Sequence, residues 1–189
     1  MIILIAVNQL LLYIWYFTGP VFIEDGLPLY TCRIADILLV IAYITDNRFL
    51  RALGVYLGFI GGVVAVLTPA LYEYSIFHYT NIDFFLSHIT LMSLSMYYFM
   101  HDEDGYFISV KNRIMKYTFY ILLVIAIINK ILGTNYSYTE HPPFLGNVFA
   151  KMNWPLYFIL LIGMYEFSIV LQTYIFTFFE RERDELCEE

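Results

Sequence analysis

Six long apolar segments dominate this chain and restrict the class of fold that it can adopt. They are Ile2–Thr18, Leu29–Thr45, Leu50–Pro69, Ile82–Met100, Ile114–Leu132 and Trp154–Phe179. A helix that crosses a bilayer needs about 20 mostly apolar residues, and these runs reach or approach that length. Only 14% of the residues are charged, against about 25% in soluble domains. The sequence therefore predicts an all-α, polytopic transmembrane helical bundle of six helices.

The positions of glycine and proline between the apolar segments indicate one domain. Glycine and proline fall between the apolar segments, as in "TGP", "GLP" and "HPPFLG", and they favour turns. Glycines at helical spacing in the third segment (Gly54, Gly58, Gly61 and Gly62) are typical of helices that pack closely. We predict a single transmembrane domain over residues 1–180 and a short charged cytoplasmic tail over 181–189.

The basic residues predict the orientation of the bundle, because cytoplasmic loops of membrane proteins carry an excess of Lys and Arg. Most of the ten lie in the second and fourth loops, their flanks and the tail: Arg48, Arg51, Lys111, Arg113, Lys116, Arg181 and Arg183. Arg33, Lys130 and Lys151 fall towards the other side. Both termini are therefore expected in the cytoplasm, with the first, third and fifth loops outside.

The two cysteines and the net charge of −7 say little about partners. Cys32 lies in an apolar segment and Cys187 in the charged tail, so a disulfide between them is not expected. Much of the negative charge lies in "HDEDG" and in the tail. No His or Cys spacing is typical of a metal site. We expect membrane lipids as partners, no nucleic acid, no metal and no cofactor, and protein partners stay open.

The predicted topology brings a thiol and an imidazole to the same depth. Cys32 lies near the start of the second segment and His88 near the start of the fourth, and both segments run inward from the outer face. At 1.5 Å per residue, each side chain lies roughly 5–10 Å below the start of its helix. The sequence permits a Cys–His pair near the outer leaflet.

Further polar residues share this depth and are candidates to bind substrate or stabilise charge. Asp36 follows Cys32 by four residues, on the same helix face. Arg33 is three residues from Asp36 and could pair with it, or hold a lipid phosphate. Asn135 and Tyr136 follow the fifth segment on the same side of the membrane, where they could donate hydrogen bonds to an oxyanion.

Such a cluster is suited to acyl transfer. A neighbouring imidazole can take the proton of a thiol, and the thiolate can attack an ester carbonyl to give a thioester. An alcohol or water would then release the acyl group, with the imidazole moving the protons.

Other interpretations of the same residues stay open. Free cysteine is often a plain packing residue, and Arg33 with Asp36 could be a buried ion pair that fixes helix packing. The whole cluster could bind a small ligand in a non-enzymatic subunit of a transporter. It could also belong to a scaffold protein in which polar residues only fix the helices.

Five short motifs occur in a characteristic order: "LPLYTC", "LTP", "FFLSH", "GTNYSY" and "NWPLYF", from Leu27 to Phe158. In this order they resemble the YwaF / TMEM164 family of integral membrane proteins. Members of that family resemble seven-helix proteins, so the six segments here are expected to lack the family's first helix. The resemblance also leads us to expect a multi-pass protein of a bacterial cell membrane.

The resemblance implies a specific chemistry. Its animal branch is known for phospholipid acyltransferase activity that uses a cysteine and a histidine, and it is distantly similar to the AIG1/ADTRP hydrolases. The family cysteine falls on Cys32 of "LPLYTC" and the histidine on His88 of "FFLSH". The expected function is therefore acyl transfer on lipid esters, with Cys32 and His88 as catalytic residues and Arg33, Asp36, Asn135 and Tyr136 as stabilising ones.

Overall fold

Helices make up every regular element that the structure describes. This computed structural model describes residues 1–18, 22–74, 77–102, 104–143 and 152–188, and side chains up to Phe179. The elements are α1 (Ile2–Thr18), η1 (Phe22–Gly26), α2 (Thr31–Thr45), α3 (Arg48–Leu67), α4 (Tyr79–Met100), α5 (Tyr106–Ser109), α6 (Lys111–Leu132), η2 (Tyr136–Tyr138) and α8 (Trp154–Glu188). The all-α prediction is confirmed.

Each of the six predicted segments coincides with one long helix. α1 has the predicted bounds, whereas α3, α4 and α6 begin two or three residues before the predicted starts. Polar residues at the membrane surface continue a helix as readily as apolar ones, so the apolar run underestimates its length. α8 likewise continues into the predicted tail. Lys151 and the side chains of Arg181, Arg183 and Cys187 lie outside the described part of the chain.

Local chemistry explains where the helices begin and end. Asp46 takes a left-handed conformation with φ of 49° at the end of α2. Asn47 then caps α3 by accepting the backbone N–H of Leu50 at 3.0 Å. α6 ends at Gly133, whose φ of 70° is a conformation that glycine adopts without steric cost. Asp46 and Asn47 thus join the antiparallel helices α2 and α3 through a connection of two residues.

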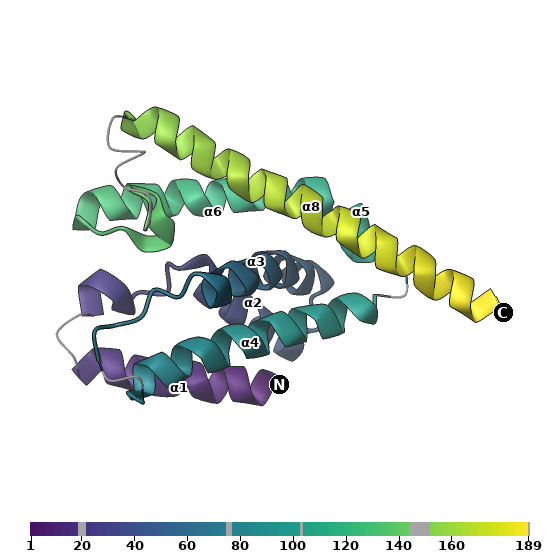
Figure 1. Cartoon of the computed structure of the whole chain (residues 1–189), viewed down its shortest axis with the longest axis horizontal. Helices are drawn as coiled ribbons and strands as arrows, with labels where there is room; N and C mark the ends of the chain where they lie inside the picture. The colour runs from purple at the N-terminus through teal and green to yellow at the C-terminus, as the bar shows by residue number, and fades with distance from the viewer. Residues whose placement is uncertain (19–21, 75–76, 103, 144–151, 189) are drawn as a thin grey trace.

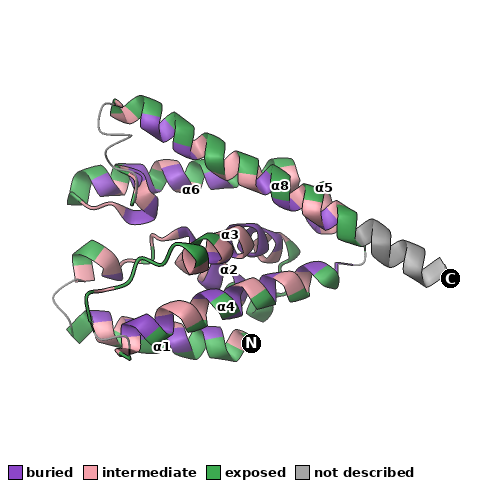
Figure 2. Ribbon diagram, in the orientation of Figure 1, coloured by how far each residue is buried: buried purple, intermediate pink, exposed green. Residues whose placement is uncertain are grey.

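The long helices form two groups that lie side by side along the bundle (Figure 1). One group contains α1 to α4, and the other contains α6 and α8. α3 contacts both α6 and α8 and so joins the two groups. Buried and exposed residues form stripes along each helix (Figure 2), with many large apolar side chains on the exposed stripes.

Close packing of α3 against its neighbours depends on glycine. A Cβ atom on Gly54 would lie 2.8 Å from Leu39 of α2, and one on Gly58 would lie 2.7 Å from Leu91 of α4. A Cβ on Gly62 would lie 2.5 Å from Met92 and 3.1 Å from the carbonyl oxygen of His88. Gly61 has nothing within 4 Å. Gly54, Gly58 and Gly62 therefore set the approach of α2 and α4 to α3.

By length and composition, α3, α6 and the Trp154–Phe179 part of α8 are able to cross a membrane. α1 is apolar but shorter, with 17 residues, and α2 has 15. A helical membrane bundle is consistent with this arrangement. The number of spans stays a prediction.

The loops gather at the two ends of the bundle, and both chain ends lie at the same end (Figure 1). At the opposite end, Tyr16 of α1 contacts Tyr72 between α3 and α4. There the backbone N–H of Leu27 also reaches the hydroxyl of Tyr136, after α6. The loops predicted to share one face of the membrane are therefore in contact.

Candidate functional site

Cys32 is the second residue of α2, at the end of the bundle where the first, third and fifth loops meet. Its side chain is partly buried, forms no disulfide and packs against the main hydrophobic core. Backbone N–H groups of Cys32 and Arg33 lie within hydrogen-bonding reach of the thiol. The first turn of a helix has unpaired N–H groups that favour negative charge. The first turn of α2 therefore offers backbone donors to an oxyanion.

His88 lies on α4 and is 9% exposed. Its Nδ1 atom is 2.6 Å from the carbonyl oxygen of Phe84, one helical turn earlier. A carbonyl oxygen only accepts, so Nδ1 carries the proton and Nε2 has the free lone pair. Nε2 makes no hydrogen bond to any residue that the structure describes. This tautomer is the one that a general base needs.

Asp36 is a buried carboxylate on the helix of Cys32, and it contacts α1. It is 3% exposed and lies on the same face of α2 as Cys32, one turn further along. Gln9 of α1 donates a hydrogen bond from Nε2 to Asp36 Oδ2 at 2.6 Å. The thiol and the carboxylate thus share one face of α2, and Gln9 joins that face to α1.

Cys32 and His88 do not contact each other directly. No hydrogen bond joins the thiol to the imidazole among the described residues. Such bonds are often long in enzymes without substrate and shorten when it binds. α1 fixes the helix of His88, because Asn8 Nδ2 donates to Ser87 Oγ at 2.6 Å.

Comparison with known proteins assigns the chain to one family. The sequence model of the TMEM164 family matches residues 1–175, which include every candidate site residue. The chain belongs to the TMEM164 family. No curated protein and no solved structure matches it. Family membership and the apolar helices together make this a membrane protein.

In this TMEM164 family member, Arg33 does not pair with Asp36. Its guanidinium donates to the Tyr16 hydroxyl at 2.6 Å and to the backbone carbonyl of Asp25. It also lies over the rings of Tyr16 and Tyr30, 4.8 and 5.2 Å from their centroids. No ion pair joins Arg33 to Asp36 within the described residues. The ion-pair interpretation is wrong, because the guanidinium points to the first loop.

Tyr72 completes the contacts around this loop. Its hydroxyl donates to Asp25 Oδ2 at 2.9 Å and lies 2.9 Å from the hydroxyl of Tyr16. Burial raises the pKa of Tyr72, and the neighbouring Tyr16 and Asp25 raise it further. Tyr72 therefore stays protonated and keeps donating to Asp25.

Asn135 and Tyr136 hold loops together in this TMEM164 family member. The Tyr136 hydroxyl donates to the carbonyl of Ile23 at 2.8 Å and accepts from the N–H of Leu27 at 3.0 Å. Asn135 Nδ2 donates to the carbonyl of His141 at 2.9 Å. It lines a cavity of about 520 Å³ with Asn129, Lys130, Gly133, Thr134, Glu140 and His141. Cys32 and His88 are not among the residues that line this cavity. The predicted role of Asn135 and Tyr136 in stabilising charge therefore stays a prediction.

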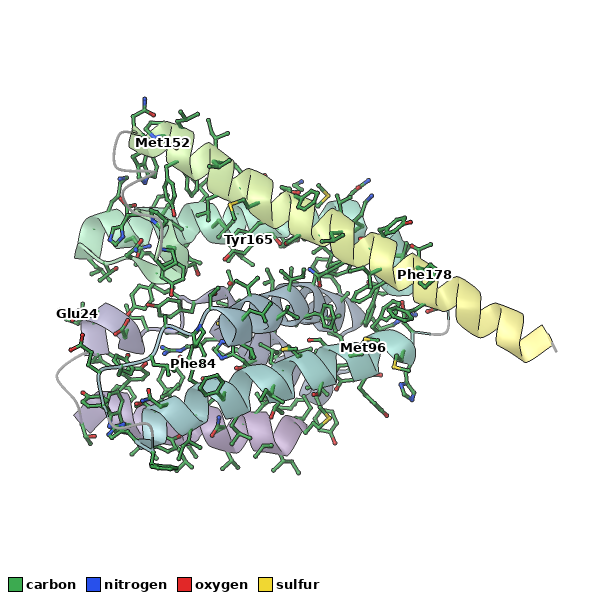
Figure 3. The ribbon with its side chains drawn as sticks, viewed as in Figure 1. Glu24, Phe84, Met96, Met152, Tyr165 and Phe178 are labelled. Atoms are coloured by element: carbon green, nitrogen blue, oxygen red, sulfur yellow. The ribbon has the colours of Figure 1, made fainter. Side chains whose placement is uncertain are left out.

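The sequence interpretation missed three groups near the candidate site. Asn8 and Gln9 are adjacent amides within an otherwise apolar helix, and polar residues in such segments are costly enough to have been a signal. Tyr165 of α8, labelled in Figure 3, lies with its hydroxyl 3.1 Å from Thr31 Oγ1, next to Cys32.

No group of three His, Cys, Asp or Glu side chains that could hold a metal ion occurs within the described residues.

Proposed function

We propose that this TMEM164 family member is an integral membrane enzyme that transfers acyl groups from lipid esters through Cys32 and His88. The observation that carries the proposal is Asp36, whose buried carboxylate lies one helical turn from Cys32 on the same face of α2 and is held by Gln9 of α1. Ionisable groups within a membrane bundle are costly, and they commonly mark functional sites. The family resemblance of "LPLYTC" and "FFLSH" supports the same two residues.

The proposed reaction has two steps. His88 Nε2 takes the proton of the Cys32 thiol, and the thiolate attacks the carbonyl carbon of the lipid ester. The C–O bond of the ester breaks, and His88 returns the proton to the departing alcohol. The acyl group then remains on Cys32 as a thioester. An acceptor with an O–H group attacks that thioester, releases the acyl group and restores the thiol.

The location of the site suits a lipid substrate. Cys32 lies in the first turn of its helix, so an ester at the level of the glycerol backbone would reach it while its acyl chains stay in the hydrocarbon. Membrane lipids are the partners of this reaction. We propose a bacterial cell membrane as its location, with both termini and the 181–189 tail in the cytoplasm. The basic residues of the second and fourth loops support that orientation.

Labelling with a thiol-directed, lipid-like ester probe tests the dyad. The protein contains two cysteines, so Cys187→Ser leaves Cys32 as the single thiol and serves as the parent. We expect labelling of the parent to be lost in Cys32→Ala and to fall about 100-fold in rate in His88→Gln, the effect of removing a general base. Lipid analysis of cells that express wild type or Cys32→Ala should then show a changed acyl profile.

Two results would reject the proposal. Labelling that is absent, or that is indifferent to His88→Gln, would show that Cys32 is not an activated nucleophile. A small lipid that co-purifies and still binds Cys32→Ser would instead identify a binding protein.

A further inference from the structure

Two buried oxygen atoms beside Cys32 have no donor. Asp36 Oδ2 accepts from Gln9 Nε2, but Asp36 Oδ1 and Gln9 Oε1 receive no hydrogen bond from any residue that the structure describes. Both atoms are inaccessible from outside, and Asp36 as a whole is 3% exposed. A buried oxygen without a donor has lost the hydrogen bonds that water would give it, which destabilises the folded chain. This pair of side chains is therefore complementary to a group that donates hydrogen bonds.

Two oxygens without a donor, Asp36 Oδ1 and Gln9 Oε1, indicate which kind of molecule could bind between them. The Gln9 amide donates from its nitrogen to Asp36 Oδ2. The two oxygens without a donor, Gln9 Oε1 and Asp36 Oδ1, therefore belong to side chains that contact each other. A water molecule carries two O–H bonds and can donate to both oxygens at once. A single alcohol hydroxyl carries one, so it would leave one oxygen unpaired.

We propose that Gln9 and Asp36 bind the water that releases the acyl group from Cys32, which makes the protein a lipid-ester hydrolase. This inference rests on the proposed Cys32 thioester. Asp36 and Cys32 are one helical turn apart on the same face of α2. A water held on Asp36 Oδ1 and Gln9 Oε1 thus lies beside the carbonyl of an acyl group on Cys32.

The chemistry balances without any further reactant. The water oxygen forms a C–O bond to the thioester carbonyl carbon, and one of its protons passes to the Asp36 carboxylate. The C–S bond breaks, and the Cys32 thiolate takes the proton from Asp36. The products are a free fatty acid and the original thiol. Gln9 orients both the water and the Asp36 carboxylate throughout.

Heavy-oxygen water provides the direct test on the wild-type protein. The purified protein in detergent micelles is given p-nitrophenyl octanoate and a lysophospholipid as a competing acceptor. We expect free octanoate that carries one heavy oxygen atom as the main product, even with the lysophospholipid in excess.

The second arm measures the two steps separately, by the burst of p-nitrophenol and by the acyl group found on Cys32 by mass spectrometry. In Asp36→Asn and Gln9→Leu, we expect Cys32 to become acylated but to lose the acyl group about 10- to 100-fold more slowly, so acyl-enzyme accumulates. Asn8→Leu is the matched control, because it removes the neighbouring amide, which contacts Ser87 and not Asp36. In that variant the rate of deacylation should stay at the wild-type value.

The outcomes separate the inference from the proposed function. Transfer of the acyl group to the lysophospholipid without labelled octanoate would overturn the inference and leave the Cys32 thioester intact. An unchanged rate of deacylation in both Asp36→Asn and Gln9→Leu would also overturn the inference and leave the Cys32 thioester intact. The absence of any acyl group on Cys32 in the wild type would reject the proposed function and, with it, this inference. The heavy-oxygen experiment needs no variant, so a folding defect in a variant does not prevent the test.

Discussion

Ser137 caps the helix that carries Cys32, although the two residues are far apart in the chain. Its hydroxyl accepts the backbone N–H of Thr31, the first residue of α2, at 3.0 Å and donates to the carbonyl of Leu29 at 2.7 Å. The residue that precedes α2, Tyr30, provides no side-chain cap. Ser137 also has a left-handed backbone with φ of 50°. A strained loop residue thus fixes the start of the nucleophile helix.

Ser137→Ala should therefore lower stability. It removes both hydroxyl contacts and leaves the Thr31 N–H unpaired, a loss of about 0.5–2 kcal/mol for an N-cap. Thermal unfolding in detergent measures the effect. Ser93→Ala is the control, because Ser93 is a mid-helix residue whose hydroxyl donates to the carbonyl of Ile89 in its own helix. Equal melting temperatures for the two variants would contradict the capping role of Ser137.

Gly62→Ala should destabilise the bundle, whereas its neighbour Gly61→Ala should not. The new methyl group at Gly62 would collide with Met92 and press on the carbonyl of His88. Overpacking of this kind costs about 1–3 kcal/mol. At Gly61 the space is open, and alanine should add up to about 1 kcal/mol through its higher helix propensity. Unfolding curves of the two variants should therefore shift in opposite directions, and a shared direction would be inconsistent with the packing described here.

Arg33→Lys should destabilise the protein despite keeping the charge. An ammonium group is a single point, and it cannot reproduce the guanidinium contacts to both the Tyr16 hydroxyl and the Asp25 carbonyl. The expected loss is about 1.5–3 kcal/mol, the range for a hydrogen bond to a charged group. Arg51→Lys makes the same exchange at a partly buried arginine whose hydrogen bond goes to the exposed carboxylate of Asp46 at 2.7 Å. That control should change by less than about 1 kcal/mol, and a similar loss in both variants would count against a special role for Arg33.

Asp104 should contribute stability that disappears in acid. The hydrogen bond from Arg48 holds the pKa of Asp104 below its ordinary value of 3.8. Because the folded pKa is the lower one, the stabilisation is present above about pH 4 and is lost as the pH falls further. The difference in melting temperature between wild type and Asp104→Asn should favour wild type at pH 6 and shrink as the pH falls below 3.8. A difference that stays constant over this range would show that the Arg48 contact is not responsible.

Much of the fold was predictable because hydropathy and turn chemistry act locally. The apolar lengths of the six segments predicted the long helices, and glycine and proline marked the loops between them. The topology then placed Cys32 and His88 towards one end of the bundle, since their helices run in the same direction. Of the four glycines predicted to allow close packing of α3, Gly54, Gly58 and Gly62 do so, whereas Gly61 faces open space.

The partners of the polar side chains were decided only by the tertiary structure. Spacing along α2 allowed Arg33 to meet Asp36, yet Arg33 contacts Tyr16 and Asp36 contacts Gln9. A membrane helix is apolar both where it faces lipid and where it packs on another helix, so its sequence specifies its rotation only weakly. The amide of Gln9 and the hydroxyl of Ser137 acquire their roles once α1 and the loop after α6 are docked on α2. The sequence by itself therefore determined the helices and the end at which Cys32 lies, and the docking of those helices decided what surrounds it.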